Sequence, residues 1–485
     1  MVRHISRRDL LRASAAAAGL VVADPLLPKS AWAAPKRRTA VLPATGANAP
    51  FEHVVVVMME NRSFDHFLGW LPGADGVQDG LTYTDTSGVT YPTFHLGGDY
   101  QGCDGDDPDH SYEGGLTQLH EGFLATATPG DQLPLGYYNK EDIGFRADLA
   151  TNFTVLDNYF ASIMAETYPN RFYQHSARTD RLHNNGVTQV ADPDALPTIW
   201  DRINASGGDV TGRYYATNLP FIGLWGTKYT PLIGTFPEFL ATAAAGQLPN
   251  VSFVDPDFAG EELNSGSNDD HPRGDIRGGA WFLQQVYTAL RSNEAAWAKT
   301  VLVINYDEWG GFYDHVTPPK VVDDSTNATL TVGGPPSPSD KYEFSFNQLG
   351  FRVPCIVASP FAPAQIWNQG PYEHTSVLKM IEWRWGLEPL TARDANARNL
   401  AEVLDFSANN TALAVGSYDP NPAQAQPCGP QSAHYTHPEA VPSPELPEVP
   451  LPAVLPVAAA VAGGAAMAVR AKRKKSEPEV SDAEA

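Results

Sequence analysis

The chain has 485 residues, of which 42% are hydrophobic and 10% aromatic, so it can bury a large core and is not disordered over most of its length. A formal net charge of −23 argues against a nucleic-acid partner, because binding to a phosphate backbone depends on clustered Lys and Arg. Three cysteines without CxxC spacing exclude a dense disulfide framework and a CxxC-type zinc site.

The first 33 residues predict an export signal. The segment SRRDLL, from Ser6 to Leu11, resembles a twin-arginine signal, and an apolar run from Ala13 to Val22 and the AWA cleavage motif ending at Ala33 follow it. An amphipathic N-terminal helix is the alternative, but these three features come in the order of a signal peptide. We therefore expect residues 1–33 to be removed and the protein to be secreted or held at the extracellular face of the cell membrane.

Residues 51–401 predict one large catalytic domain. Apolar runs predict strands at 54–59, 153–156, 210–215, 251–254, 301–304 and 353–358. Helical patterns lie between them, for example at 280–291 and 375–385. Alternation of this kind favours an α/β fold with three α/β/α layers and a mostly parallel central sheet. The Gly- and Pro-rich stretch 320–340 is expected to be a surface loop.

Two of the predicted strands are followed by polar pairs. Glu60 and Asn61 follow the first strand, and Asp307 and Glu308 come shortly after the run 301–304. Because chemistry in α/β sheets collects beyond the carboxyl ends of the strands, we expect these side chains to meet at one edge. A single acidic residue after a strand is more often a cap or a solvated charge. Two such pairs favour a site for a divalent metal ion of unknown identity.

The segment AETYPNRFY offers a nucleophile. Pro169 suits the first turn of a helix, so Thr167 would stand at a helix N-terminus, where free amides and the helix dipole attract phosphate. A hydroxyl coordinated to a metal loses its proton more easily and can attack phosphorus. A simple helix cap is the alternative. Asn170 and Arg171 favour the catalytic interpretation, because Arg can hold phosphate oxygens bidentately.

The C-terminal part changes composition. Residues 402–450 predict a Pro-rich spacer, residues 451–469 a membrane anchor, and residues 470–485 a basic and then acidic cytoplasmic tail. Because the apolar run is rich in Ala and Gly, a surface helix or a segment that is trimmed away is the alternative.

Five motifs in sequence order carry a family resemblance: HVVVVMMENRSFDHFLG, TYPNR, NDDHP, DEWGGFYDHV and YEHTSVLKMIEWRWGL. They resemble the bacterial and plant non-specific phospholipase C family, which also includes certain bacterial acid phosphatases and has an alkaline-phosphatase-like α/β/α fold. The similarity spans residues 53 to about 387. It implies a phosphothreonine intermediate that water hydrolyses. It also implies a divalent metal ion bound by Glu60, Asn61, Thr167, Asp307 and Glu308.

The same resemblance implies roles for histidines. His110 and His271 match positions where the family places histidines that contact phosphate or the leaving oxygen, and His271 would act as a general acid. An ordinary loop histidine is the alternative for His271. His315 and His374 are further candidates for contact with phosphate, although each could instead orient a loop or begin a helix.

We therefore expect a phospholipase C that cleaves the glycerol-side phosphodiester bond of phospholipids and releases diacylglycerol and a phosphorylated head group. An acid phosphatase acting on monoesters is the alternative, because the same nucleophile and metal serve both ester types. A sulfatase is disfavoured, since Thr167 is not converted to the aldehyde that sulfatases use. The intact set of polar groups argues against a non-catalytic surface protein.

Overall fold

The computed structural model describes residues 42–103, 105–179, 181–258, 267–324, 342 and 345–410. The export signal expected at 1–33, most of the spacer, the anchor expected at 451–469 and the tail at 470–485 lie outside these residues, as does most of the loop expected at 320–340. Within the described part of the chain, no helix has both the length and the apolar character needed to cross a membrane.

An eight-stranded sheet forms the centre of the protein. Its spatial order is β12 (Gln365–Trp367), β6 (Thr154–Leu156), β11 (Cys355–Ala358), β10 (Thr300–Tyr306), β1 (His53–Met59), β9 (Val251–Asp255), β7 (Gly212–Ala216) and β8 (Ile233–Thr235). Only β11 runs against its neighbours β10 and β6, and the other strand pairs of the sheet are parallel. The predicted α/β class with a mostly parallel sheet is confirmed.

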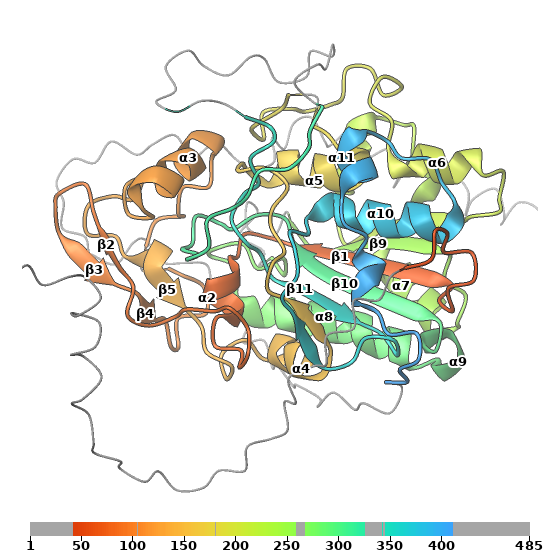
Figure 1. The fold of residues 1–485 in the computed structure, drawn as a ribbon, viewed down its shortest axis with the longest axis horizontal. Helices are drawn as coiled ribbons and strands as arrows, with labels where there is room; N and C mark the ends of the chain where they lie inside the picture. Colours follow the sequence, from red (N-terminus) through yellow and green to blue (C-terminus); the bar gives the residue numbers. More distant parts are fainter. Residues whose placement is uncertain are drawn as a thin grey trace, which may run out of the picture. The chain divides into compact units, whose positions relative to one another are not determined.

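Helices cover both faces of the sheet (Figure 1). One layer contains α5 (Thr167–Ser176), α6 (Ile199–Ala205), α10 (His374–Trp385) and α11 (Ala392–Asn396), and the other α4 (Phe145–Asn152), α7 (Phe236–Ala244), α8 (Ile276–Arg291) and α9 (Glu294–Trp297). The remaining helices are α2 (Phe64–Leu68) and α3 (Tyr112–Glu121), with 3-10 turns at Leu133–Leu135, Phe221–Trp225, Thr230–Leu232 and Leu400–Val403. Two small sheets pair β2 (Thr82–Thr84) with β3 (Thr90–Pro92) and β4 (Phe94–His95) with β5 (Gly136–Tyr137).

Strand β1 lies inside the sheet, between β10 and β9, and every residue from Val54 to Met59 is buried. An unbroken apolar run is what a strand covered by helices on both faces requires. The neighbouring strand β10 is buried along its whole length for the same reason. These two strands bring the ends of their segments to the same edge of the sheet.

The packing of α10 against α11 buries two carboxyl groups. Glu382 is 3% exposed and Asp394 is fully buried. Asp394 accepts backbone N–H bonds from Leu390 at 2.7 Å and Thr391 at 2.8 Å, so its charge is well satisfied. Neither carboxyl oxygen of Glu382 has a hydrogen-bond donor among the described residues. Burial, followed by the neighbouring Asp394, raises the pKa of Glu382 to about 10.

We expect the Glu382→Gln variant to be more stable than the wild type, by a margin that grows between pH 5 and pH 9. The folded protein keeps a proton on Glu382 that the unfolded chain releases above its ordinary pKa, so wild-type stability falls as the pH rises through this window. The slope from one such group is at most about 1.4 kcal/mol per pH unit. Thermal unfolding at several pH values measures the difference. A margin independent of pH would show that Glu382 is ionised in the folded protein.

Candidate active site

The polar pairs that follow β1 and β10 meet at one edge of the sheet. The two strands are parallel, with Met59 opposite Tyr306, so the residues that follow each strand leave the sheet at the same edge. The Asn61 backbone N–H donates to Asp307 Oδ1 at 3.1 Å, and the Glu308 N–H donates to the same oxygen at 2.7 Å. Asn61 has a φ of 58°, in the left-handed region that Asn tolerates better than most residues. These bonds fix the Asp307 carboxylate beside the end of β1.

This group of oxygens fits a divalent metal ion. Asn61 Oδ1 is buried and has no hydrogen-bond partner among the residues that the structure describes. Glu60, Asp307 and Glu308 are buried carboxylates at the same edge. Burial raises the pKa of Glu308 to about 7, and a cation would favour its ionised form. Carboxylate and amide oxygens are the ligands that hard divalent cations prefer.

Arg171 lies among the carboxylates. Its guanidinium is 3.2 Å from Glu60 Oε1, 3.4 Å from Asp307 Oδ2 and 3.5 Å from Asp255 Oδ1, and it stacks on Phe258 at 4.1 Å from the ring centre. Burial alone would lower the pKa of Arg171, but the three carboxylates raise it above its ordinary value. Its charge balances the acidic groups, and it also donates to the backbone oxygen of Met58 at 3.3 Å.

Thr167 is the first residue of α5 and is buried. Arg171, one turn further along the same helix, reaches Glu60 and Asp307, so the first turn of α5 lies at the sheet edge. The structure therefore brings the start of α5 to the polar edge.

Asn170 holds the loop that leads into α5. Its side-chain amide donates to Ala165 O at 2.7 Å and Glu166 O at 3.2 Å, and its Oδ1 accepts the Ile163 N–H at 3.1 Å. Because both ends of the amide bond to the backbone, Asn170 orients the start of the helix.

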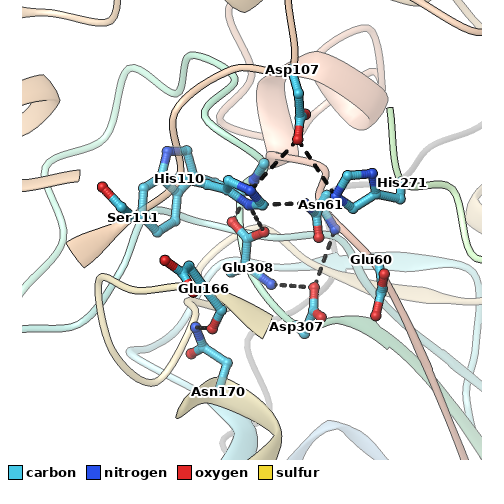
Figure 2. Close-up of polar contacts among 12 residues, drawn as sticks. Glu60, Asn61, Asp107, His110, Ser111, Glu166, Asn170, His271, Asp307 and Glu308 are labelled. Atoms are coloured by element: carbon cyan, nitrogen blue, oxygen red, sulfur yellow. Dashed lines mark hydrogen bonds and ion pairs between the residues drawn. The ribbon is translucent and has the colours of Figure 1, made fainter. Parts of the chain in front are cut away.

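His110 and His271 lie beyond Glu308, on either side of Asp107 (Figure 2). His110 Nδ1 is 2.6 Å from Glu308 Oε1, and Nε2 of each histidine is 3.8 Å from Asp107 Oδ2. His271 Nδ1 donates to Pro272 O at 3.0 Å, because a carbonyl oxygen can only accept. The two rings come from separate loops and meet next to the carboxylate edge.

The loop of His271 is tied to both central strands. The Glu60 N–H donates to Asp269 O at 2.8 Å. Tyr306, at the end of β10, donates its hydroxyl to Asp270 Oδ2 at 2.6 Å, and Arg146 pairs with the same carboxylate. Asp270 itself has a φ of 85°. The structure thus holds His271 through the two residues that precede it.

His374 supports Asp307 from behind. It is the first residue of α10 and fully buried, and its Nε2–H donates to Asp307 O at 2.6 Å. Burial lowers the pKa of His374 to about 4, which keeps the ring neutral. It contacts the backbone of a proposed metal ligand.

His315 belongs to another cluster. Its Nδ1 is 2.5 Å from Asp65 Oδ2, and the fully buried Arg352 bonds to Asp65 at 3.2 Å and to Asp314 at 2.9 Å. Hydrogen bonding to Asp65 raises the pKa of His315. The hydrogen bonds that the structure describes for His315 are with this cluster, which braces α2. Among the described residues, none of them is with Glu60, Asn61, Asp307 or Glu308.

Two acidic residues at the edge are not predicted from the sequence. Asp255 ends β9 and contacts Arg171, and burial raises its pKa to about 7. The sequence pattern that predicts Glu60, an acidic residue directly after an apolar run, is also present at Asp255. Asp107 gives no such signal, because it lies among other acidic residues in the run DGDDPDH.

Comparison with known proteins agrees with this geometry. The Phosphoesterase family matches residues 51–208 and 226–388. The chain belongs to this family. Among relatives of this phosphoesterase, phospholipase C A of Mycobacterium tuberculosis is 31% identical over 473 residues, which cover 83% of this chain and 86% of that protein. Non-specific phospholipase C1 of Arabidopsis thaliana is 32% identical over 389 residues, which cover 71% of this chain and 69% of that protein. The family resemblance inferred from the five motifs is confirmed.

A solved structure of an alkaline phosphatase superfamily protein from Vibrio parahaemolyticus matches this phosphoesterase with a TM-score of 0.38 and 7% identity, covering 74% of this chain and 71% of that one. The three-layer fold rests on the strand order and the helix packing of the phosphoesterase itself.

Proposed function

We propose that this phosphoesterase is a phospholipase C, which hydrolyses the glycerol-side phosphodiester bond of phospholipids. The observation that carries the proposal is the meeting of Glu60, Asn61, Asp307 and Glu308 with the first turn of α5 at one edge of the sheet. The similarity to phospholipases C along most of the chain supports the diester as substrate.

Glu60, Asn61, Asp307 and Glu308 would hold a divalent metal ion together with Thr167. When bound, such an ion lowers the pKa of a coordinated hydroxyl and offsets negative charge on phosphate oxygens. His374 keeps the Asp307 backbone in place. Arg171 limits the repulsion among the carboxylates.

In the proposed reaction, the Thr167 oxygen forms a bond to phosphorus while the bond from phosphorus to the glycerol oxygen breaks. The hydroxyl proton of Thr167 passes to solvent, diacylglycerol leaves with a proton from the general acid, and the phosphorylated head group stays on Thr167. The positive end of the α5 dipole, at Thr167, would stabilise the negative charge on the phosphate oxygens. His271 would be this general acid. Its Nε2–H would donate a proton to the oxygen that leaves, which offsets the negative charge that develops there. Water then hydrolyses the phosphothreonine and restores the hydroxyl.

Substrate assays test the proposal. We expect purified protein to release diacylglycerol and phosphocholine from phosphatidylcholine, and to turn over a simple phosphate monoester at least about tenfold more slowly, since binding of the lipid part adds to transition-state stabilisation. Monoester hydrolysis without diacylglycerol release would identify an acid phosphatase instead.

A further inference from the structure

We propose that Asp107, His110 and His271 form a second divalent-cation site, of a kind that suits zinc, next to the oxygen-rich one. Asp107 Oδ2, His110 Nε2 and His271 Nε2 all lie within 4.8 Å of one another. The carboxylate oxygen is 3.8 Å from each of the two nitrogen atoms. Ligand atoms on a tetrahedral zinc ion are about 3.3 Å apart, so each of these two oxygen–nitrogen distances would shorten by roughly 0.5 Å around an ion. Figure 2 shows the Asp107 carboxylate directed between the two rings.

His271 presents the correct nitrogen. Its Nδ1 carries the hydrogen that bonds to Pro272 O at 3.0 Å, so the neutral ring has its lone pair on Nε2, the atom that faces Asp107. Metal-binding histidines are usually oriented in this way, with the other ring nitrogen donating to a carbonyl or carboxylate oxygen. The ring is 2% exposed, so its orientation is fixed by packing.

His110 has the matching arrangement. Its Nδ1 lies 2.6 Å from Glu308 Oε1 and 2.9 Å from Asn61 Nδ2. It cannot donate to the carboxylate and accept from the amide at the same time, and the shorter contact favours donation to the Glu308 carboxyl oxygen. The lone pair of His110 is then on Nε2, facing Asp107. Glu308 thus contacts a ligand of the second site while it belongs to the first.

The donor atoms distinguish the two sites. Two imidazoles and one carboxylate suit zinc, whereas an all-oxygen set accepts harder cations as well as zinc. Asp107 is 27% exposed, which leaves coordination positions open on the solvent side, as in catalytic zinc sites. A cation bound there would replace the His271 proton as the positive charge facing the leaving oxygen. This last role rests on the proposed function, but metal binding does not.

Metal analysis tests the inference. The full-length protein is stripped with a chelator and equilibrated with zinc chloride, and bound zinc is measured by mass spectrometry of the metal and by titration calorimetry. We expect about two equivalents in the wild type, and one fewer in Asp107→Asn and in His271→Ala. Asp107→Asn preserves side-chain size at a partly exposed position, and thermal unfolding checks that both variants fold. His95→Ala is the control, because His95 pairs with Asp142 at 2.6 Å on the surface.

The outcomes separate the two sites. Asp307→Asn should lose the other equivalent and keep zinc at the histidines. Unchanged zinc content in Asp107→Asn and His271→Ala would overturn the second site, and would leave the oxygen-rich site standing if Asp307→Asn still loses one equivalent. Zinc lost in the histidine-site variants but not in Asp307→Asn would support the second site and show that the oxygen-rich site holds no zinc.

Discussion

Replacing Thr167 with valine is expected to lower turnover of phosphatidylcholine by about 10⁴-fold or more, because no other group takes over from a missing nucleophile. Valine has nearly the shape of threonine, and the first turn of α5 remains held by Asn170 and its bonds to the preceding backbone. The fold should therefore survive. Initial rates on phosphatidylcholine vesicles, with circular dichroism on the same preparation, measure the effect.

Two variants act as controls for Thr167. Thr167→Ser keeps a hydroxyl and should retain measurable activity. Thr151→Val makes the same chemical change in α4, where the Thr151 hydroxyl donates to the backbone oxygens of Ala147 at 2.8 Å and Asp148 at 3.2 Å, and should leave the rate unchanged. Mass spectrometry after an acid quench should find phosphate on Thr167 in the wild type. A fully active Thr167→Val enzyme would mean that another group attacks phosphorus.

Replacing Arg171 with methionine is expected to destabilise the protein by about 3–5 kcal/mol, the usual cost of breaking a buried ion pair. Glu60, Asp255 and Asp307 would remain buried without their cation. Their folded pKa values would rise above those of the unfolded chain, so the loss of stability should be larger at pH 8 than at pH 6. Urea unfolding at both pH values measures it.

A double variant tests the cause. Adding Asp255→Asn to Arg171→Met removes one of the stranded charges and should recover part of the lost stability, whereas independent effects would simply add. Arg213→Met is the matched control, because Arg213 pairs with Glu238 at 2.6 Å on the surface and such pairs contribute about 0–1 kcal/mol. If Arg171→Met costs no more than Arg213→Met, Arg171 does not balance the acidic edge.

Most of the fold could be predicted because its central strands are unbroken apolar runs. Strands β1, β9 and β10 appear where their Val, Leu and Ile residues predict them. The edge strands β8 and β12 have three residues each, too few to show a pattern, and they are missed. The reversed direction of β11 is missed too, because strand direction depends on the path of the connecting chain and not on composition.

The candidate site could be predicted in part, for a physical reason. Residues that follow strands can be recognised because the sequence changes there from apolar to polar side chains, as it does at Glu60 and Asp307. Asp107 and His110 come from a loop with no such change, and only the folded chain brings them to His271. Phosphate binding by Arg171 stays a prediction, and a sequence cannot show that three carboxylates surround its guanidinium.

The pairing of β1 with β10 makes the candidate metal centre a late product of folding. The Asn61 N–H and the Asp307 carboxylate that it binds are 246 positions apart in the chain. A nascent polypeptide in which β10 has not yet been synthesised contains only part of the proposed ligand set, so we expect it not to retain the ion. Metal binding would therefore require a molecule that has finished folding. Folding would not require the metal, so a chelator present during synthesis should leave an intact sheet that can be loaded afterwards.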